Sequence, residues 1–264
     1  MELKIFEKTL KNNNALRIND DLLLFNDLEL YNLKTNESIL FENFDSLYEY
    51  KIDGDKFSNI IDMIKEFRVS YEGGRGAGSS NQKMGGGFTS ADQRGRKGED
   101  YGKIKFPAEL NARSGGRYKS YDKTLRTFEK MYKDADIEYG VTIDAQGFVH
   151  RHIRGGSTSV PISGNKGEMV VHNHPSGGNF SKQDLVSIAS TSEKGIVAVG
   201  SNTKSKSRMR YTLTKTNKFN AKEFIKGVNK AQWPTQYSYD KGADWWLRRN
   251  AKKYGYKYSA IKIG

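Results

Sequence analysis

The sequence predicts a mixed α/β fold in which a small N-terminal α+β unit and a Gly-rich linker precede one larger domain. In residues 121–264, short runs rich in Val, Ile and Tyr alternate with segments whose apolar residues recur at helical spacing. In residues 71–120 this periodicity is lost, and these positions hold 12 of the chain's 27 glycines. A chain of 264 residues is long enough for one large or two small domains.

Residues 1–70 are predicted to be a small docking or assembly unit. Residues 16–25 and 38–50 are typical of short strands broken by Asn and Asp turns, whereas residues 57–67 place Phe and Ile at helical spacing. The unit has no histidine and no motif that carries chemistry. Docking or assembly is therefore its expected role.

Residues 71–120 are predicted to be a flexible linker, because a segment with so many glycines and so few apolar residues cannot recover the entropy lost on ordering. Its arginines and Phe88 would suit a basic tether that touches nucleic acid, and a plain solvated spacer would have the same composition. No G-x-x-x-x-G-K-S/T pattern is present, which excludes a phosphate-binding loop of that kind.

The larger domain, residues 121–264, is predicted to alternate helices and strands. The predicted helices are 121–132, a helix that begins after Ser181, 221–230 and 242–254. The predicted strands are two around an Ala-Gln-Gly turn within 138–155, then 168–174, 195–200, 208–214 and 256–263. A polar hairpin loop at 201–207 joins two of these strands.

Composition limits the class of protein. The chain has no cysteine, which excludes disulfides and Cys-rich metal sites, and no apolar run approaches the roughly 18 residues of a membrane span. Acidic residues near the start, where a secretory signal would be basic, predict a cytoplasmic protein. The Asn- and Lys-rich composition is also compatible with a phage protein, which would then be virion-associated.

The net charge of +13 is unevenly spread: residues 1–70 carry −5 and residues 71–264 carry +18. A basic field of this size favours a polyanion or an acidic protein surface as partner. A lysine-rich solvated surface would give the same charge. The charge therefore indicates association and does not define a site.

Val170 to Asp184 reads V-V-H-N-H-P-S-G-G-N-F-S-K-Q-D, with two of the chain's four histidines one residue apart. Because residues i and i+2 of a strand project to one face, His172 and His174 can offer two imidazoles to one metal ion. The loop after Pro175 turns the chain back, so Asp184 in the next helix can supply an oxygen ligand. Two imidazoles and a carboxylate with an open fourth position are typical of a catalytic zinc site.

Hydrolysis also needs an acid/base beside the metal, and Glu138 is our candidate. It begins a predicted strand, and Gly140 beside it permits close packing. Ser181 could help to hold the oxyanion that forms when water attacks a carbonyl. The plain alternatives are a solvent-facing strand end for Glu138 and a helix cap for Ser181. Glu168, just before the histidine strand, is the competing acid.

H-N-H-P-S-G with a downstream S-K-Q-D, preceded by E-Y-G, resembles the JAB/JAMM (MPN-like) zinc metalloprotease family, and the first motif is similar to that of its DNA-repair-associated RadC branch. The similarity covers roughly residues 120–215. It implies a mixed sheet flanked by helices, with Zn²⁺ held by His172, His174 and Asp184. It also implies Glu138 as general acid/base, Ser181 as oxyanion-stabilising, and hydrolysis of peptide or isopeptide bonds through a metal-activated water.

Two functions are therefore predicted. The first is a zinc hydrolase whose basic surface steers a protein or peptide substrate, acidic in part; the complete set of Glu, two His, Ser and Asp favours it. The second is a catalytically silent JAB-like protein, either nucleic-acid-binding through the basic linker and surface or a phage structural component. The loop of six residues between His174 and Ser181, short for the motif, and the positive charge favour the second. No membrane partner is expected.

His150 and His152 form a second pair in F-V-H-R-H-I-R-G. As alternate strand residues they could face one metal ion, but no Asp or Glu follows at useful spacing, and Arg151 and Arg154 add positive charge. A basic exposed strand is the expected structure, and a substrate-binding rim near the active site is the alternative.

Overall fold

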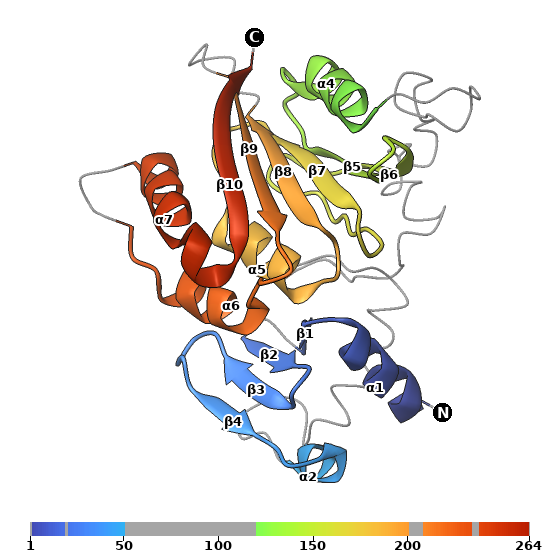
Figure 1. Ribbon diagram of the computed structural model, residues 1–264, viewed down its shortest axis with the longest axis vertical. Helices are drawn as coiled ribbons and strands as arrows, with labels where there is room; N and C mark the ends of the chain where they lie inside the picture. Colours follow the sequence, from blue (N-terminus) through green and yellow to red (C-terminus); the bar gives the residue numbers. More distant parts are fainter. Residues whose placement is uncertain (1, 19–20, 51–119, 201–207, 234–237, 264) are drawn as a thin grey trace.

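The computed structural model describes residues 2–18, 21–50, 120–200, 208–233 and 238–263. Over these residues the fold is mixed α/β, as predicted, with two sheets and six helices (Figure 1). Each of these helices is too short or too polar to cross a membrane. The helix expected at 57–67, the linker expected at 71–120 (apart from Ser120) and the loop expected at 201–207 lie outside the described residues.

The larger domain is built on a six-stranded sheet with the order β10-β9-β8-β7-β5-β6. Its strands are β5 (Tyr139–Ile143), β6 (Val149–Arg154), β7 (Met169–His174), β8 (Gly195–Gly200), β9 (Arg208–Lys215) and β10 (Tyr256–Ile263). Neighbouring strands are antiparallel except β7 and β8, which are parallel. Each strand lies within a residue or two of the range that the sequence predicted.

Four helices cover this sheet: α4 (Tyr121–Tyr132) on one face, and α5 (Lys182–Ser190), α6 (Ala221–Lys230) and α7 (Tyr239–Tyr254) on the other (Figure 1). The buried side chains divide in the same way, since Val171 of β7 packs in the core beneath α4 and Val170 in the core beneath α5, α6 and α7. Because side chains alternate along a strand, His172 and His174 lie on the same face as Val170.

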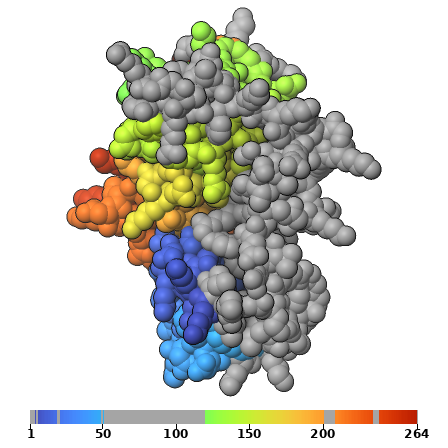
Figure 2. Space-filling view, turned by 90° about the vertical axis from the view of Figure 1, so that its right-hand side faces the viewer, coloured from blue at the N-terminus to red at the C-terminus, as the bar shows by residue number. Residues whose placement is uncertain are grey.

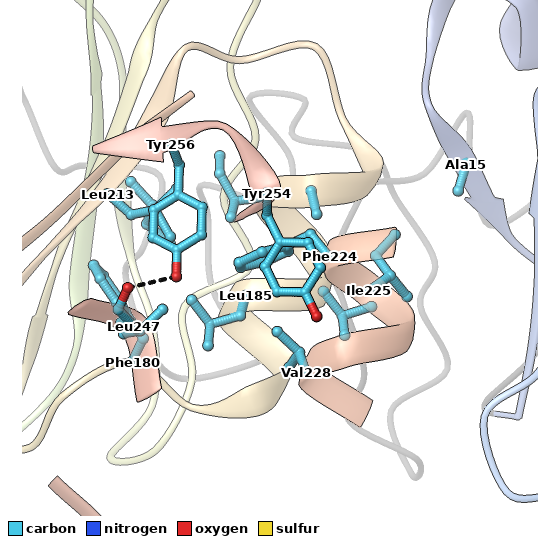
Figure 3. Close-up of a cluster of buried hydrophobic side chains, with 14 of the residues drawn as sticks. Ala15, Phe180, Leu185, Leu213, Phe224, Ile225, Val228, Leu247, Tyr254 and Tyr256 are labelled. Atoms are coloured by element: carbon cyan, nitrogen blue, oxygen red, sulfur yellow. Dashed lines mark hydrogen bonds between the residues drawn. The ribbon is translucent and has the colours of Figure 1, made fainter. Parts of the chain in front are cut away.

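The core beneath α6 and α7 is rich in aromatic side chains (Figure 3). Phe224 of α6 meets Trp246, Tyr254 and Tyr256 edge to face, with ring centroids between 5.2 and 6.0 Å apart. The Tyr256 hydroxyl donates to the Leu247 carbonyl oxygen at 2.6 Å. These contacts fix α7 against β10, the edge strand of the sheet.

The N-terminal unit is an antiparallel sheet with the order β1-β2-β3-β4 and two helices. Its elements are α1 (Glu2–Asn12), β1 (Ala15–Arg17), β2 (Leu22–Phe25), β3 (Glu29–Asn32), β4 (Ser38–Leu40) and α2 (Phe44–Glu49). The strand predicted over 38–50 is therefore wrong beyond Leu40. Asn43 and Ser46 form a capping box, in which each side chain accepts from the other residue's backbone N–H, and this starts α2 instead.

Strands β1, β2 and β3 of the small sheet bury side chains on both faces, whereas β4 is exposed. One face makes a core with α1 and α2, and the other adds Leu23, Phe25 and Tyr31 to the core of the larger domain. Figure 2 shows the surface of the small unit, in blue, continuing into that of the larger domain, in yellow and orange. The described part of the unit thus packs against the chain's own larger domain.

Charged side chains join the small sheet to α6. Glu29 of β3 pairs with Lys222 and Lys226 of α6, and Lys226 Nζ lies 2.7 Å from Glu29 Oε1. Burial raises the pKa of Glu29, but the two ammonium groups outweigh burial and lower the pKa to about 2. The carboxylate is therefore ionised at neutral pH, which strengthens both ion pairs.

Candidate metal centre

β7 places His172 and His174 in the middle of the larger sheet, between neighbours with small side chains. The Cα partners of His172 are Gly140 on β5 and Ala198 on β8, and the partner of His174 on β8 is Gly200. Cross-strand neighbours on one face lie about 5 Å apart, so bulky residues at these three positions would compete with the imidazole rings.

The two glycines also let surrounding segments come close. A Cβ atom on Gly140 would lie 3.0 Å from Ile162 Cγ2, and one on Gly200 would lie 2.7 Å from the Gly177 carbonyl oxygen. A larger residue at either position would push away a segment that encloses the histidines. The absence of side chains here therefore shapes the site.

Ser181 and Asp184 form the capping box that starts α5, as the Ser-x-x-Asp pattern predicts. Ser181 Oγ accepts from the Asp184 backbone N–H at 3.0 Å, and Asp184 Oδ2 accepts from the Ser181 backbone N–H at 2.8 Å. The Ser181 hydroxyl also donates to Asp184 Oδ2 at 2.8 Å. The capping box therefore fixes the direction of the Asp184 carboxylate.

Three predicted ligands converge at the end of β7. The Nε2 atoms of His172 and His174 are 2.7 Å apart, and the Asp184 carboxylate lies 3.9 Å from the first and 3.6 Å from the second. One donor atom from each residue falls within 4.8 Å of the others. Across the described ranges, no other three His, Asp or Glu residues converge in this way.

A hydrogen bond sets the tautomer of His174. Its Nδ1 lies 3.0 Å from the Gly178 carbonyl oxygen. A carbonyl can only accept, so Nδ1 carries the proton and Nε2 keeps its lone pair, which faces His172 and Asp184. This is the tautomer that a metal-ligating histidine needs.

The electrostatics of the cluster favour the ligand forms at neutral pH. Burial, reinforced by His174, lowers the pKa of His172 to about 4, so its ring is neutral. Burial raises the pKa of Asp184, but the two imidazoles and the hydrogen bonds from Ser181 outweigh burial and lower the pKa below its ordinary value. A neutral imidazole and an ionised carboxylate are both ready to bind a cation.

Glu138 is buried immediately before β5, on the same sheet face as the two histidines. Gly140 pairs with His172, so two residues further along this antiparallel register Glu138 lies opposite His174. Its side chain is only 6% exposed. Burial, helped by the negative charge of Asp184, raises the pKa of Glu138 to about 7 although His174 and the Val160 N–H act to lower it.

Asn173, between the two histidines, holds Glu138 in place, a role that the sequence did not reveal. Its Oδ1 accepts from the Tyr139 backbone N–H at 2.6 Å, and its Nδ2 donates to the Ile137 carbonyl oxygen at 2.9 Å. Both bonds go to the residues that flank Glu138, and Asn173 is fully buried. Only the register of β5 against β7 could have predicted this contact.

The loop that carries Gly178 is fixed by residues from α7 and β10, which the sequence also did not reveal. Asp240 Oδ1 accepts from the Asn179 backbone N–H at 2.8 Å, and Asn179 Nδ2 donates to the Tyr258 hydroxyl oxygen at 2.8 Å. The Tyr258 hydroxyl in turn donates to Asp244 Oδ1 at 3.0 Å. No local pattern links Asn179 to partners that are 61 and 79 residues away.

No protein-family model matches this chain, and no curated protein or solved structure matches it either. Two imidazole nitrogens and an ionised carboxylate that converge beside a buried carboxylic acid can hold a metal ion and supply an acid/base next to it.

Glu168, the competing acid, lies away from this cluster. It precedes β7, whereas His174 ends that strand, so six residues of extended chain, about 20 Å, separate the two. Glu168 instead accepts from the backbone and side-chain N–H groups of Asn165, and its Oε1 lies 3.8 Å from His150 Nε2. Glu138 is therefore the acid near the histidines.

His150 and His152 have separate partners. His150 Nε2 lies 2.8 Å from Asp144 Oδ2, and His152 Nε2 lies 2.7 Å from the Tyr132 hydroxyl of α4. Burial lowers the pKa of His152 to about 4. The prediction of an exposed strand is wrong, because every residue of β6 is buried or half-buried.

Proposed function

We propose that this protein is a zinc-dependent hydrolase of peptide or isopeptide bonds that acts on a protein or peptide substrate in the cytoplasm. The observation that carries the proposal is the convergence of His172, His174 and Asp184 on the face of the sheet that also holds the buried Glu138. The resemblance of H-N-H-P-S-G and S-K-Q-D to the JAB/JAMM motif supports the same function.

The donor set suits zinc. Two imidazoles and one carboxylate, with no sulfur, are typical of catalytic zinc sites, whereas Ca²⁺ and Mg²⁺ prefer oxygen ligands alone. When bound, zinc would acidify a water molecule and polarise a substrate carbonyl. Gly178 contributes indirectly, since its carbonyl oxygen fixes the His174 tautomer.

Glu138 is proposed to carry the proton. With a pKa of about 7, both of its protonation states are populated at neutral pH, so one carboxyl group can take a proton from water and give it to the leaving amine. The Asn173 hydrogen bonds hold the backbone on both sides of Glu138, which keeps its side chain opposite His174.

Ser181 is proposed first to orient Asp184. The Ser181 hydroxyl donates its one proton to Asp184 Oδ2 in a hydrogen bond. Stabilising an oxyanion would require that proton to turn from Asp184 to the substrate, so the oxyanion role stays a prediction. The same hydrogen bond favours a second candidate function, a binding protein that holds zinc without turnover.

Two conservative variants separate these candidates. Asp184→Asn should lose zinc, because an amide is a poor ligand, whereas Glu138→Gln should keep one equivalent of zinc and the fold. Zinc content is measured by mass spectrometry. Turnover is measured by mass spectrometry on a peptide library that includes dipeptides joined through the lysine ε-amine.

The hydrolase proposal predicts cleavage by the wild type and a loss of about a hundredfold or more in Glu138→Gln. Cleavage by Glu138→Gln at the wild-type rate would overturn the acid/base assignment. A wild type that holds zinc and cleaves no member of the library would favour the binding protein.

A further inference from the structure

The outer face of α7 carries a dense row of cations around one tryptophan. Lys241, Trp245, Arg248, Arg249 and Lys252 are all exposed, and we call them the α7 stripe. At about 100° per residue these five positions fall within an arc of roughly 100° on the helix. The buried residues of α7, among them Trp246 and Leu247, occupy the opposite arc and pack on the domain core.

The two acids of α7 already have partners, and one of these partners, Arg248, belongs to the stripe. Asp240 accepts from the Asn179 backbone N–H of the metal-site loop, and Asp244 accepts from the Tyr258 hydroxyl and pairs with Arg248. In the part of the chain that the structure describes, Lys241, Arg249 and Lys252 have no carboxylate within ion-pair distance. Three positive charges on the stripe are therefore available for an external anion.

Trp245 gives the stripe a second chemical property. Its side chain is 39% exposed, and the Arg249 guanidinium lies 5.5 Å from the centre of its ring. An exposed indole covered in part by a guanidinium offers a flat surface on which planar groups stack. Nucleic-acid bases are such groups, and base stacking on aromatic and arginine side chains is common where single strands bind.

We propose that the α7 stripe binds single-stranded nucleic acid, with phosphates on Lys241, Arg249 and Lys252 and a base stacked on Trp245. An acidic polypeptide would satisfy the charges, but it would leave the indole unused. The stripe is about 16 Å long, enough for a few nucleotides. α7 lies beside β10 at the margin of the view in Figure 1, and the side chains of its stripe are exposed. This binding does not depend on the hydrolase activity.

α1 provides a matched control for charge. Lys4, Lys8 and Lys11 are exposed at spacings of four and three residues along α1, and they form a row of three cations that has no cation–π contact with an aromatic ring among the described residues. The triple variants K241E/R249E/K252E and K4E/K8E/K11E change the net charge of the protein by the same amount. If only the overall charge of the protein attracted the nucleic acid, binding would weaken equally in the two triple variants.

The experiment measures binding of fluorescein-labelled dT12 by fluorescence anisotropy over a series of salt concentrations. The α7 triple variant should bind about tenfold or more weakly at low salt, and the slope of log K against log salt should fall by about 2. The α1 triple variant should bind within about twofold of the wild type. Circular dichroism and zinc content check that both variants fold.

Trp245 tests the stacking part of the proposal without a change in charge. Trp245→Ala should weaken dT12 binding about tenfold at every salt concentration, and Trp245→Phe should restore most of it. Equal losses in the two triple variants, or no loss in Trp245→Ala, would overturn the proposal. A glutamate 12-mer that binds more tightly than dT12 would assign the stripe to an acidic protein instead.

Discussion

Two clusters of histidine and carboxylate side chains lie beside the larger sheet, and the histidines of both come from its strands. The metal cluster consists of His172, His174 and Asp184, and the hairpin cluster consists of Asp144, His150 and Glu168. In the hairpin cluster both acids already accept from N–H groups of neighbouring turns: Asp144 from two backbone groups and Glu168 from Asn165. In the metal cluster Asp184 also accepts from its own capping box, but one donor atom from each of the three residues lies within 4.8 Å of the others.

This difference shows that residue type alone does not make a metal site. Burial raises the pKa of Asp144, but His150 and the backbone N–H groups lower it, so that carboxylate is ionised and already hydrogen-bonded within its own hairpin. His174, by contrast, donates its Nδ1–H to the Gly178 carbonyl oxygen, and its Nε2 lone pair faces the cluster. The convergence of one donor atom from each of three residues distinguishes the candidate metal site.

Loss of a ligand should have the largest effect. His174→Ala should lower zinc affinity by more than roughly a hundredfold, because it removes a metal ligand and not only a hydrogen-bond partner that orients one. His150→Ala, the matched change in the hairpin cluster, should keep one equivalent of zinc. Zinc retained after dialysis against a competing chelator measures both, and equal retention by the two variants would contradict the assignment.

Removal of the buried acid should change how stability depends on pH in the metal-free protein. Glu138 has its pKa raised from 4.5 to about 7, so the folded state binds its proton more tightly, and the stability that this provides is lost as pH rises through 7. Glu138→Gln cannot ionise. The free energy of unfolding of this variant should therefore exceed that of the wild type at pH 8 by on the order of 2 kcal/mol, and the two values should be equal near pH 4.

Urea unfolding of both proteins in the presence of EDTA measures this difference. Because His172 and Asp184 titrate in both proteins, their contributions largely cancel in the comparison. A gap between the two proteins that stays constant from pH 4 to pH 8 would mean that Glu138 does not titrate as the structure indicates.

Loss of the Tyr258 hydroxyl of β10, which holds the loop beside His174, should lower zinc affinity less than loss of a ligand. Tyr258→Phe removes the hydroxyl that joins Asn179 to Asp244, and it should weaken zinc binding about tenfold and shift the visible absorption bands of the cobalt-substituted protein. Tyr256→Phe removes a buried hydroxyl from the same strand, one that bonds to Leu247 (Figure 3). It should change stability alone, so cobalt spectra altered equally in both variants would argue against a specific role for Tyr258.

The hairpin cluster itself should give the smallest effect. His150→Ala loses the hydrogen bond to Asp144 and should destabilise the zinc-saturated protein by about 1 kcal/mol in urea unfolding. A free energy of unfolding that is unchanged within error would show that this hydrogen bond does not stabilise the fold and would contradict a structural role for the hairpin cluster.

Local patterns were enough to predict the parts of the site that lie close together in the chain. The alternation of His172 and His174 and the capping box of Ser181 depend only on strand and helix geometry, and the structure has both. The same rules missed α2, because Asn43 and Ser46 start a helix within a run of apolar residues that also suits a strand.

Contacts between distant segments could not be predicted. Asn173 reaches the backbone beside Glu138 only because β5 pairs with β7, and Asn179 reaches Tyr258 only because α7 and β10 close over the loop. Asp144, the hydrogen-bond partner of His150, was missed because only acids that follow the histidine were considered, and Asp144 precedes it by six residues. Sheet register, which a single sequence does not specify, decides the first of these contacts, and the packing of α7 and β10 decides the second.

X-ray absorption at the zinc edge of the zinc-loaded protein tests directly whether His172, His174 and Asp184 hold one zinc ion. We expect nitrogen and oxygen ligands at about 2.0–2.2 Å, with the scattering pattern of two imidazoles in the wild type and of one in His174→Ala. A wild-type spectrum without imidazole scattering, or one that His174→Ala leaves unchanged, would contradict this ligand assignment.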